Sequence, residues 1–376
     1  MRVELRPGLR SGPGLALCAL CVLAAPAGAQ DPPAYTVRLA VAQDRPRVGV
    51  RARGLEVRDG DVGDVLLRGV DALDLRPAGG GIRLAGSVAR PRSVLLATAG
   101  AAAPIRVDGR ALIGRVEVRL VGGGLLVINR LPLERYLRGL VGAEMSPRWP
   151  LEALAAQAVA ARTYFMQRRL QRQGADYDLS ASTLDQVYRG IGRESDNTRR
   201  AVRRTRGLVL TWGKQPAEAL YHACCGGRTR AAGEVFGNAV PYLRSVADPD
   251  CSACPKHRWT VRLELDWLAR RLRRLGWRGP LRGVAAAAGG LALLGPDGRR
   301  LVIDRRQLRR AAGMRRVPSS RFRATVEGDT LVLAGRGSGH GVGLCQWGAR
   351  GMAEKGADFR AILKRYYPGC RLRKLY

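Results

Sequence analysis

The feature that most constrains this 376-residue chain is a helix-forming stretch whose apolar stripe contains an arginine. The stretch "PLEALAAQAVAARTYFMQRRLQRQG" begins at Pro150 and ends at Gly174, and apolar residues recur along it with the period of an α-helix. Arg162 lies on that stripe, near the middle of the helix. A guanidinium there must find an acceptor or extend to solvent, and extension past Phe165 and Met166 is awkward. The sequence therefore predicts either an ion pair or an anionic ligand at Arg162.

A shorter helix precedes this stretch, and the connection between the two is expected to carry Glu144. The segment "LPLERYLRGLVG" places Pro132 in a first helical turn and Gly142 at the C-terminal end. Glu144 follows among apolar neighbours in "GLVGAEM". Apolar surroundings raise the pKa of a carboxyl group, which suits a general acid for glycosidic-bond cleavage. A partly buried glutamate is more often a structural ion-pair partner, for example of Arg162, and the local sequence leaves both readings open.

A glycine-rich segment near the C-terminus supplies further candidate residues. In "GRGSGHGVGLCQWGA" glycine occupies every second position from Gly335 to Gly343, so one side of an extended chain lacks side chains. This pattern allows another backbone or a ligand to approach closely, and it matches neither nucleotide-binding glycine motif. His340, between two glycines, is either a packed, hydrogen-bonded histidine or a ligand-binding one. Gln346 and Trp347 follow, and a tryptophan beside glycines is typical both of sugar stacking and of core packing.

Six cysteines follow the first 29 residues, and most of them lie in "YHACCGG" and "DPDCSACPKH". Zinc sites use thiolates and imidazoles at such spacings, here Cys225, Cys251 and Cys254 near His222. In an oxidising compartment the six cysteines instead allow 15 disulfide pairings, of which Cys225 to Cys251 is a natural one. The pattern leaves a structural zinc and a disulfide as equal alternatives, and no other cofactor is required.

The chain is strongly basic, with 65 Lys and Arg residues against 31 Asp and Glu residues and a formal net charge of +34. Such a balance predicts a polyanionic partner. Arg2, Arg6 and Arg10 precede an apolar run over 15–25 and "AGA" ending at Ala29, which are the three parts of a signal peptide. Export to a periplasm, cell wall or extracellular space argues against nucleic acid and favours cell-envelope polyanions. No other run approaches the ~20 apolar residues of a membrane span, so the mature chain is expected to have no transmembrane segment.

The periodicities predict an α+β fold, with a strand-rich N-terminal region followed by a mixed helix and strand domain with a cleft. "YTVRLAVA", "DVLLRGV", "SVLLATA" and "RVEVRL" are typical of strands, with linkers expected at "PAGGG" and "GAAAP". We therefore divide the chain into a leader (1–29), a strand-rich region (30–100) and a larger domain (101–376). Farther along, short basic helices are predicted over 267–276 and 305–313, and a hairpin is predicted to turn at Gly328 and Asp329.

Four ordered blocks resemble the SpoIID/LytB family, whose name-giving member is stage II sporulation protein D. They are "LPLERYLRGLVGAEMSPRWPLEALAAQAVAARTY", "YHACCGGRTRAAGEVFGNAVPYLRSVADPDC", "GRGSGHGVGLCQWGARGMA" and "ILKRYYPG". The likeness covers about two-thirds of the chain, and it assigns residues 101–376 to a SpoIID-like catalytic domain.

The resemblance implies a lytic transglycosylase, a carbohydrate lyase that cleaves the MurNAc–GlcNAc bond of peptide-stripped peptidoglycan strands and leaves 1,6-anhydroMurNAc ends. It implies that Glu144 of "AEM" is the catalytic acid and base, and that Arg162 of "AARTY" belongs to the active cleft. The residues expected to bind substrate are His222, His340, Gln346 and Trp347.

The resemblance also leaves alternatives. The family includes enhancers of cell-wall amidases, so a non-catalytic glycan-binding protein with an amidase partner is the alternative function. A zinc-dependent wall hydrolase built on His222 and the cysteines is another. Some members bind zinc near the cleft, although their ligand spacing does not match this chain. Ser338 stands where the family usually has a tryptophan, which removes an aromatic contact.

Overall fold

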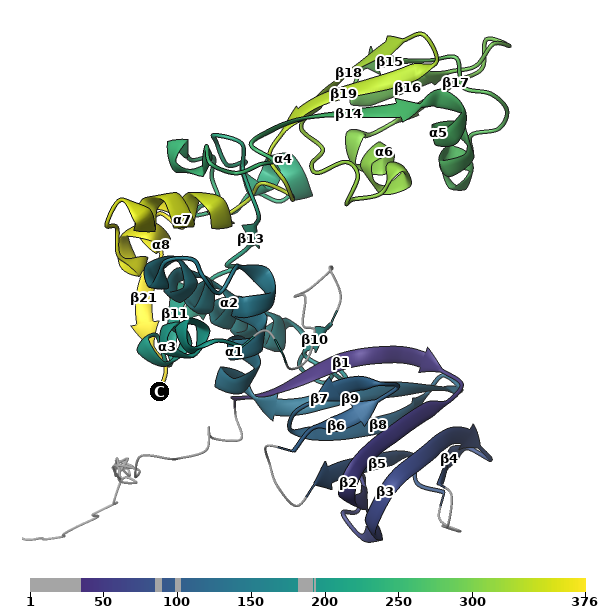
Figure 1. The fold of residues 1–376 in the computed structure, drawn as a ribbon, viewed down its shortest axis with the longest axis vertical. Coiled ribbons are helices and arrows are strands. Elements are labelled where there is room, and N and C mark those ends of the chain that lie inside the picture. Colours follow the sequence, from purple (N-terminus) through teal and green to yellow (C-terminus); the bar gives the residue numbers. More distant parts are fainter. Residues whose placement is uncertain (1–34, 85–89, 99–102, 182–191, 193) are drawn as a thin grey trace, which may run out of the picture.

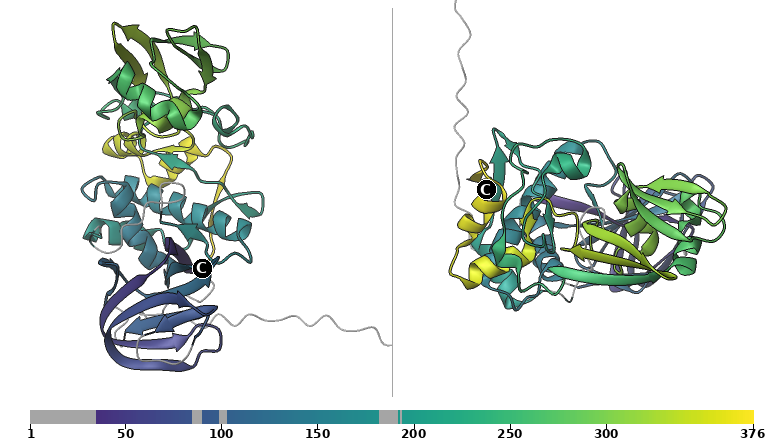
Figure 2. Two further views of the ribbon diagram at one scale, coloured as in Figure 1. Left: turned by 90° about the vertical axis from the view of Figure 1, so that its right-hand side faces the viewer. Right: turned by 90° about the horizontal axis from the view of Figure 1, so that it is seen from above.

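The computed structural model describes residues 35–84, 90–98, 103–181, 192 and 194–376. These residues form three tiers along the longest axis of the molecule (Figures 1 and 2). An N-terminal β-sheet lies at one end, a helical tier lies in the middle, and a lobe of residues 258–336 lies at the other end. The predicted α+β class is confirmed. The expected leader, residues 1–29, lies outside the described residues.

The N-terminal sheet forms because its strands bury alternate residues, as Val37 and Leu39 of β1 illustrate. Its strand order is β10-β1-β9-β8-β5-β2-β3-β4, with β6 paired to β2 and β7. The strands are β1 (Thr36–Arg45), β2 (Val48–Asp59), β3 (Val65–Ala78), β4 (Gly81–Leu84), β5 (Ser93–Thr98), β6 (Ile105–Val107), β7 (Arg110–Leu112), β8 (Arg115–Val121), β9 (Gly124–Pro132) and β10 (Leu179–Ser180). Register shifts within the β1–β9 and β2–β3 pairs accompany the curvature of the sheet.

The sheet does not end near Gly100, where the sequence suggests a domain boundary. β8 and β9 lie beyond that position, and they pair with β5 and β1, so a division there would cut the sheet. The expected linker "PAGGG" is a turn, because Gly79 and Gly80 both have positive φ and join β3 to β4. The change from strands to helices occurs instead at Pro132.

Two helices, α1 (Leu133–Glu144) and α2 (Leu151–Gln171), form the centre of the helical tier. Each follows a proline with φ near −55°, an angle that suits the start of a helix. α1 buries one face that includes Leu133, Tyr136, Leu137, Leu140 and Val141, whereas α2 is buried on every side from Ala153 to Phe165. Small alanines allow neighbouring elements to pack closely around it. Across the described residues, no helix combines the length and hydrophobicity of a membrane span.

The remaining elements of the helical tier come from distant parts of the chain. They pack with α1 and α2 into one core that also includes Val37 and Leu39 of the sheet. They are α3 (Asp196–Arg204), β11 (Leu208–Trp212), β12 (Gln215–Pro216), β13 (Tyr221–His222), α4 (Ala232–Phe236), the 3-10 helix η2 (Pro249–Cys251), β20 (Leu344–Cys345), α7 (Gln346–Glu354), α8 (Phe359–Tyr366) and β21 (Arg371–Lys374).

The lobe is inserted between two segments of the helical tier, and it has a separate hydrophobic core. The chain leaves the tier after His257 and returns at Gly337, where the Gly337 N–H donates to the His257 carbonyl over 3.1 Å. The predicted short helices and the hairpin turn at Gly328 and Asp329 lie in this lobe. Its elements are β14 (Arg258–Glu264), α5 (Leu265–Leu272), the 3-10 helix η3 (Arg273–Leu275), β15 (Gly283–Ala287), β16 (Gly290–Leu294), β17 (Arg300–Ile303), α6 (Arg305–Ala312), β18 (Phe322–Glu327) and β19 (Thr330–Arg336).

A buried ion pair joins the two central helices. The fully buried Arg162 donates from Nε and Nη2 to the two carboxylate oxygens of Glu134, over 2.7 and 2.8 Å. Its Nη1 donates to the Leu208 carbonyl at the start of β11, and the Tyr376 hydroxyl donates to the Glu134 carboxylate. The ion pair therefore connects α1, α2, β11 and the C-terminal residue.

We expect the Glu134→Gln substitution to lower the free energy of unfolding by about 3–5 kcal/mol, because it leaves the buried guanidinium without its countercharge. Urea titration followed by circular dichroism measures the change. The matched control is Glu327→Gln, which removes the exposed Arg262–Glu327 pair and should cost no more than ~1 kcal/mol. Equal effects from the two substitutions would contradict this role of the buried pair.

Candidate functional site

Glu144 is the last residue of α1, and its side chain is half-buried. The sequence placed it in the connection after a helix ending at Gly142, but α1 continues for two more residues. A glycine permits a helix end without enforcing one, and Gly142 is buried inside this helix. The helix closes when the Met145 N–H donates to the Val141 carbonyl, and Met145 is extended. The end of a packed helix thus fixes the backbone of Glu144.

Gln346 lies against Glu144, although 202 positions separate the two residues. The Gln346 amide nitrogen is 3.4 Å from Oε2 of Glu144 and 3.4 Å from Oε1 of Gln157. Gln346 begins α7, and both glutamines are buried. The structure therefore brings together two predicted site residues, Glu144 and Gln346. Sequence reasoning missed Gln157, although a polar residue in the apolar stretch of α2 was a detectable signal.

Two tryptophans flank this contact along the chain. The rings of Trp149, which follows α1, and Trp347, which follows Gln346, meet edge to face with centroids 5.0 Å apart. The Arg350 guanidinium lies 5.4 Å from the first centroid and 4.9 Å from the second. Both tryptophans are half-buried, so parts of their rings reach the surface. An aromatic pair with a nearby cation suits the stacking of a sugar that carries a carboxylate.

His222 enters this region from a neighbouring strand. β13 pairs in parallel with β20, and the register sets His222 opposite Cys345, the residue before Gln346. The buried ring has its Nδ1 3.0 Å from the Val342 carbonyl, and within the described part of the chain its Nε2 has no hydrogen-bond partner. The ring centroid is 5.5 Å from that of His340. His222 hydrogen-bonds to none of the described carboxylates, Glu144 included.

His340 is held by the backbone on both sides of its ring. Nδ1 accepts from the Val342 N–H over 3.2 Å, and Nε2 donates to the Tyr221 carbonyl over 2.8 Å. These two bonds leave neither ring nitrogen available to a ligand. Of the two alternatives for His340, its contacts are therefore those of a packed, hydrogen-bonded histidine. Its part in substrate binding stays a prediction, and its ring lies beside that of His222.

The alternating glycines admit another backbone rather than a ligand. A Cβ added at Gly343 would lie 2.1 Å from the Leu220 carbonyl oxygen, and one at Gly337 would lie 2.7 Å from the Cys224 carbonyl oxygen. One at Gly339 would lie 2.9 Å from Cβ of His222. Ser338 exchanges two backbone hydrogen bonds with Cys224 in the same crossing. The glycines thus allow the segment before β20 to lie against residues 220–225.

Arg162 forms an ion pair, one of the two roles expected for it, but with a different partner from the one suggested. Its partner is Glu134 in the first turn of α1, not Glu144, and its side chain is fully buried. All three of its hydrogen bonds go to protein groups, so it does not present an anion-binding surface. The sequence pointed to Glu144 because that residue is nearer along the chain. The antiparallel packing of α1 and α2 brings the opposite end of α1 to Arg162. Arg162 is therefore a positioning residue.

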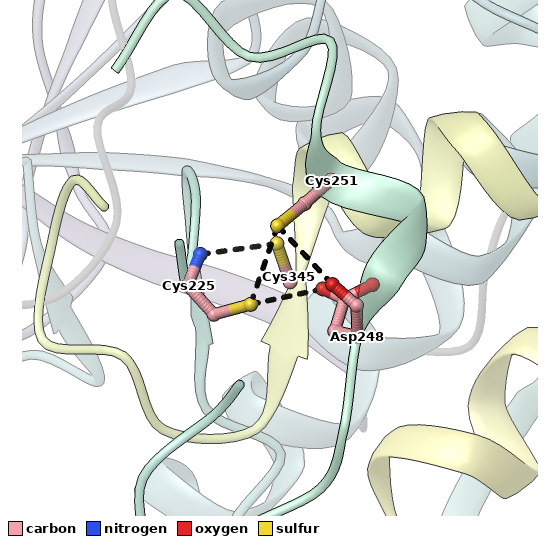
Figure 3. A group of neighbouring side chains, drawn as sticks. All are labelled: Cys225, Asp248, Cys251 and Cys345. Atoms are coloured by element: carbon pink, nitrogen blue, oxygen red, sulfur yellow. Dashed lines mark hydrogen bonds between the residues drawn. The ribbon is translucent and has the colours of Figure 1, made fainter. Parts of the chain in front are cut away.

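Three cysteines, Cys225, Cys251 and Cys345, gather around Asp248 (Figure 3). Sγ of Cys225 lies 3.5 Å from Sγ of Cys251 and 3.0 Å from Oδ2 of Asp248, and all six described cysteines are free thiols. Cys345 joins the group by accepting from the Cys225 N–H over 3.3 Å. Sequence reasoning named Cys225, Cys251 and Cys254 but missed Asp248 and Cys345. The structure pairs no two of these cysteines as a disulfide.

Two sets of side chains in this cluster are close enough to share a metal ion. One is Cys225, Asp248, Cys251 and Cys345, all buried, and the other is Cys224, Cys251 and His257. Cys254 belongs to neither set, and its sulfur accepts from the Lys256 N–H over 3.3 Å. Burial raises the pKa of Asp248, whereas hydrogen bonds from the thiols of Cys224 and Cys225 lower the pKa of Cys251.

Comparison with known proteins gives a consistent result. The family model described as stage II sporulation protein, SpoIID, matches residues 121–212. Stage II sporulation protein D of Bacillus amyloliquefaciens is 32% identical over 261 residues, which cover 64% of this chain and 74% of that protein. The chain belongs to the SpoIID family.

Two further relatives carry names other than stage II sporulation protein D. An uncharacterized protein of Brachyspira hyodysenteriae is 38% identical over 253 residues, which cover 65% of this chain and 67% of that protein. The amidase enhancer of Bacillus subtilis is 30% identical over 291 residues, which cover 63% of this chain and 40% of the enhancer. The match to the SpoIID family model includes Glu144, Gln157 and Arg162, and it ends before His222 and before the lobe.

The paired histidines of this SpoIID protein predict acid sensitivity. Burial lowers the pKa of His340 to about 4, and burial together with His340 lowers that of His222 to about 3. The unfolded chain protonates these rings near pH 6.5, so between pH 6.5 and 4 it binds more protons than the native state. The free energy of unfolding should therefore fall as the pH falls through this window, by about 1.4 kcal/mol for each unit of pKa difference.

The measurement is urea unfolding between pH 7.5 and 4, for the wild type and for His340→Asn. Whatever its stability at pH 7.5, the variant should lose stability less steeply below pH 6.5, since one titrating ring is gone. Parallel curves for the two proteins would show that His340 is not buried in its neutral form.

Proposed function

We propose that this SpoIID-family protein acts on the bacterial cell wall as a lytic transglycosylase of peptidoglycan glycan strands. The observation that carries the proposal is the Glu144 carboxylate, held at the end of a packed helix and 3.4 Å from the amide of Gln346. Trp149 follows Glu144 closely in the sequence, Trp347 follows Gln346, and the two rings are in contact. The family to which the chain belongs, and its four motif blocks, support the same assignment.

The proposed reaction needs one carboxyl group and no water. Protonated Glu144 donates its proton to the glycosidic oxygen between N-acetylmuramic acid and N-acetylglucosamine, and the bond from that oxygen to C1 of the muramic residue breaks. The C6 hydroxyl of the same muramic residue bonds to C1, and its proton passes to Glu144. The products are a 1,6-anhydro end and a free N-acetylglucosamine hydroxyl, with Glu144 protonated again. Most glycosidases instead use two carboxyl groups.

The surroundings of Glu144 support these steps. Gln346 donates to one carboxyl oxygen and restricts its rotation. Arg162 acts at a distance, because it holds Glu134 and thereby the start of the helix that ends at Glu144. Trp149 and Trp347 offer ring surface for the sugar.

A basic cavity at the base of the lobe supports binding of an acidic polymer. It has a volume of about 780 Å³, and its lining includes Arg258, Arg321, Arg323 and Arg336 together with Trp259 and Phe322. Each muramic residue of a peptide-free strand carries a lactyl carboxylate, so arginines spaced along the surface attract the strand.

The competing function is non-catalytic enhancement of an amidase, and the name of the Bacillus subtilis relative favours it as the second candidate. Such a protein would bind the glycan or the amidase without breaking a glycosidic bond. Either function requires the protein to be exported to the cell wall. Analysis of the glycan products distinguishes the transglycosylase from the enhancer.

Replacing Glu144 by glutamine should reduce cleavage of peptide-free glycan strands by about 10²–10⁴-fold, because the amide can neither donate nor accept the proton. Mass spectrometry of the products measures both rate and chemistry. We expect 1,6-anhydroMurNAc ends from the wild type. The control, Glu264→Gln, changes an exposed carboxylate of the lobe and should cleave at the wild-type rate.

Each other outcome has a defined meaning. Reducing ends would indicate a hydrolase and overturn the transglycosylase mechanism. Intact strands, with stimulation of an added wall amidase, would establish the enhancer function. Full activity of Glu144→Gln would remove Glu144 from the chemistry.

Binding to peptide-free glycan should weaken as the salt concentration rises, since arginines contribute a screened attraction. The double variant of Arg258→Ala and Arg323→Ala, both in the basic cavity, should bind more weakly and with a shallower salt dependence. The control removes the same charge from exposed positions of the N-terminal sheet, Arg53→Ala and Arg83→Ala. Equal loss of binding in the two double variants would mean that net charge, not this cavity, attracts the strand.

A further inference from the structure

We propose that Cys225, Asp248, Cys251 and Cys345 bind one zinc ion, which fixes the start of α7 and so holds Gln346 against Glu144. The zinc site itself stands apart from the proposed glycan chemistry. Only the consequence for Glu144 rests on the proposed function, and the experiments below separate the two.

The four ligand atoms have approximately the spacing of a tetrahedral metal site. All of them lie within 4.8 Å of one another. Sγ of Cys225 is 3.5 Å from Sγ of Cys251 and 3.0 Å from Oδ2 of Asp248. With Zn–S bonds of about 2.3 Å, tetrahedral geometry puts two sulfurs about 3.8 Å apart. The observed distances and the ligand types, three thiolates and one carboxylate, therefore suit zinc (Figure 3).

The surroundings of the four side chains also suit bound metal. The Gly227 N–H donates to the sulfur of Cys251 over 3.2 Å. The N–H groups of Cys225 and Gly348 both donate to the sulfur of Cys345, over 3.3 and 3.4 Å. Such donors stabilise metal-bound thiolates. The fully buried Asp248 has an Oδ1 atom with no hydrogen-bond partner among the described residues. A buried carboxylate without sufficient partners is costly, and a dication offsets that cost.

This group is a better metal site than the overlapping set of Cys224, Cys251 and His257. The overlapping set offers three ligands, and His257 is partly exposed, whereas the four-ligand group is complete and buried. A closed, four-ligand site is typical of structural zinc. The ligands also come from three separate segments, the residues after β13, the region of η2, and β20. One ion would therefore crosslink segments that the chain brings together only on folding.

The link to the candidate site is covalent and short. Cys345 is the N-terminal cap of α7, and its sulfur accepts from the Gly348 N–H in the first turn. The next residue, Gln346, makes the contact with Glu144. β20 also pairs with β13, which carries His222. Fixing Cys345 therefore fixes Gln346, and the metal is expected to act as a positioning element, not as a catalyst.

The first experiment measures metal directly in full-length protein purified without chelator. Elemental analysis should find about one zinc per chain, and cobalt substitution should give the intense near-ultraviolet absorption of thiolate-to-cobalt charge transfer. Asp248→Asn and Cys345→Ser should each lower the zinc affinity by at least about tenfold. Cys370→Ser is the matched control, because Cys370 is a free thiol outside both ligand sets, and it should retain the wild-type affinity.

Four results would overturn the zinc site. The first is that the wild-type protein binds no zinc after reconstitution with zinc, and the second is that both ligand variants retain zinc. The third is that zinc is lost from Cys224→Ser while the Asp248 and Cys345 variants keep it. The fourth is a Cys225–Cys251 disulfide, found by mass spectrometry of protein purified from an oxidising compartment. Because Cys345→Ser could fail to fold, Asp248→Asn and zinc removal from the wild type by a chelator provide independent readouts.

The second experiment tests the positioning role by hydrogen–deuterium exchange. Removing zinc from the wild type should speed exchange over residues 345–354 and leave the N-terminal sheet unchanged. If the wild type cleaves glycan, zinc removal should also slow cleavage. Unchanged exchange over α7 would overturn the positioning role. Absence of any glycan cleavage would instead count against the proposed function and leave the metal and exchange results valid.

Discussion

The buried pair of Arg162 and Glu134 is the interaction on which the central tier depends. Placing a guanidinium in a fully buried helix is costly unless each of its donors is satisfied. Here the Glu134 carboxylate takes two of its hydrogen bonds and the Leu208 carbonyl takes a third. This requirement sets the relative position of α1, α2 and β11, and the Tyr376 hydroxyl extends it to the C-terminus. The position of Glu144 follows, because it lies at the far end of the helix that begins beside Glu134.

A second constraint is the crossing of two backbones beside the site. The glycines from Gly337 to Gly343 allow the returning strand to approach residues 220–225 more closely than any side chain would permit. This crossing sets His222 opposite Cys345 and gathers the cysteines of both segments. It is also where the inserted lobe joins the helical tier. The same glycines therefore position the histidine pair, the thiol cluster and Gln346.

Much of the local structure was predictable from the sequence. Periodicity and turn residues located α2, the hairpin at Gly328 and several strands of the N-terminal sheet. The motif blocks identified the family and singled out Glu144 and Gln346, which the structure places in contact. Periodicity failed at the domain boundary near Gly100, because strand pairing across that position is non-local. It also gave no sign that residues 258–336 form a lobe with a separate core, since an insertion leaves the local pattern unchanged.

By itself, the sequence determined which segments become helices and strands, which residues are candidates for chemistry, and the strongly basic character that favours an acidic polymer. These properties depend on neighbouring residues and on composition. Only the tertiary structure decided that Arg162 pairs with Glu134, that His340 is held by backbone on both sides, and that Asp248 and Cys345 complete the thiol cluster. The reason is physical. A buried polar group takes whichever partner packing brings within hydrogen-bonding distance, and packing joins residues as far apart as Glu144 and Gln346, which no local pattern relates.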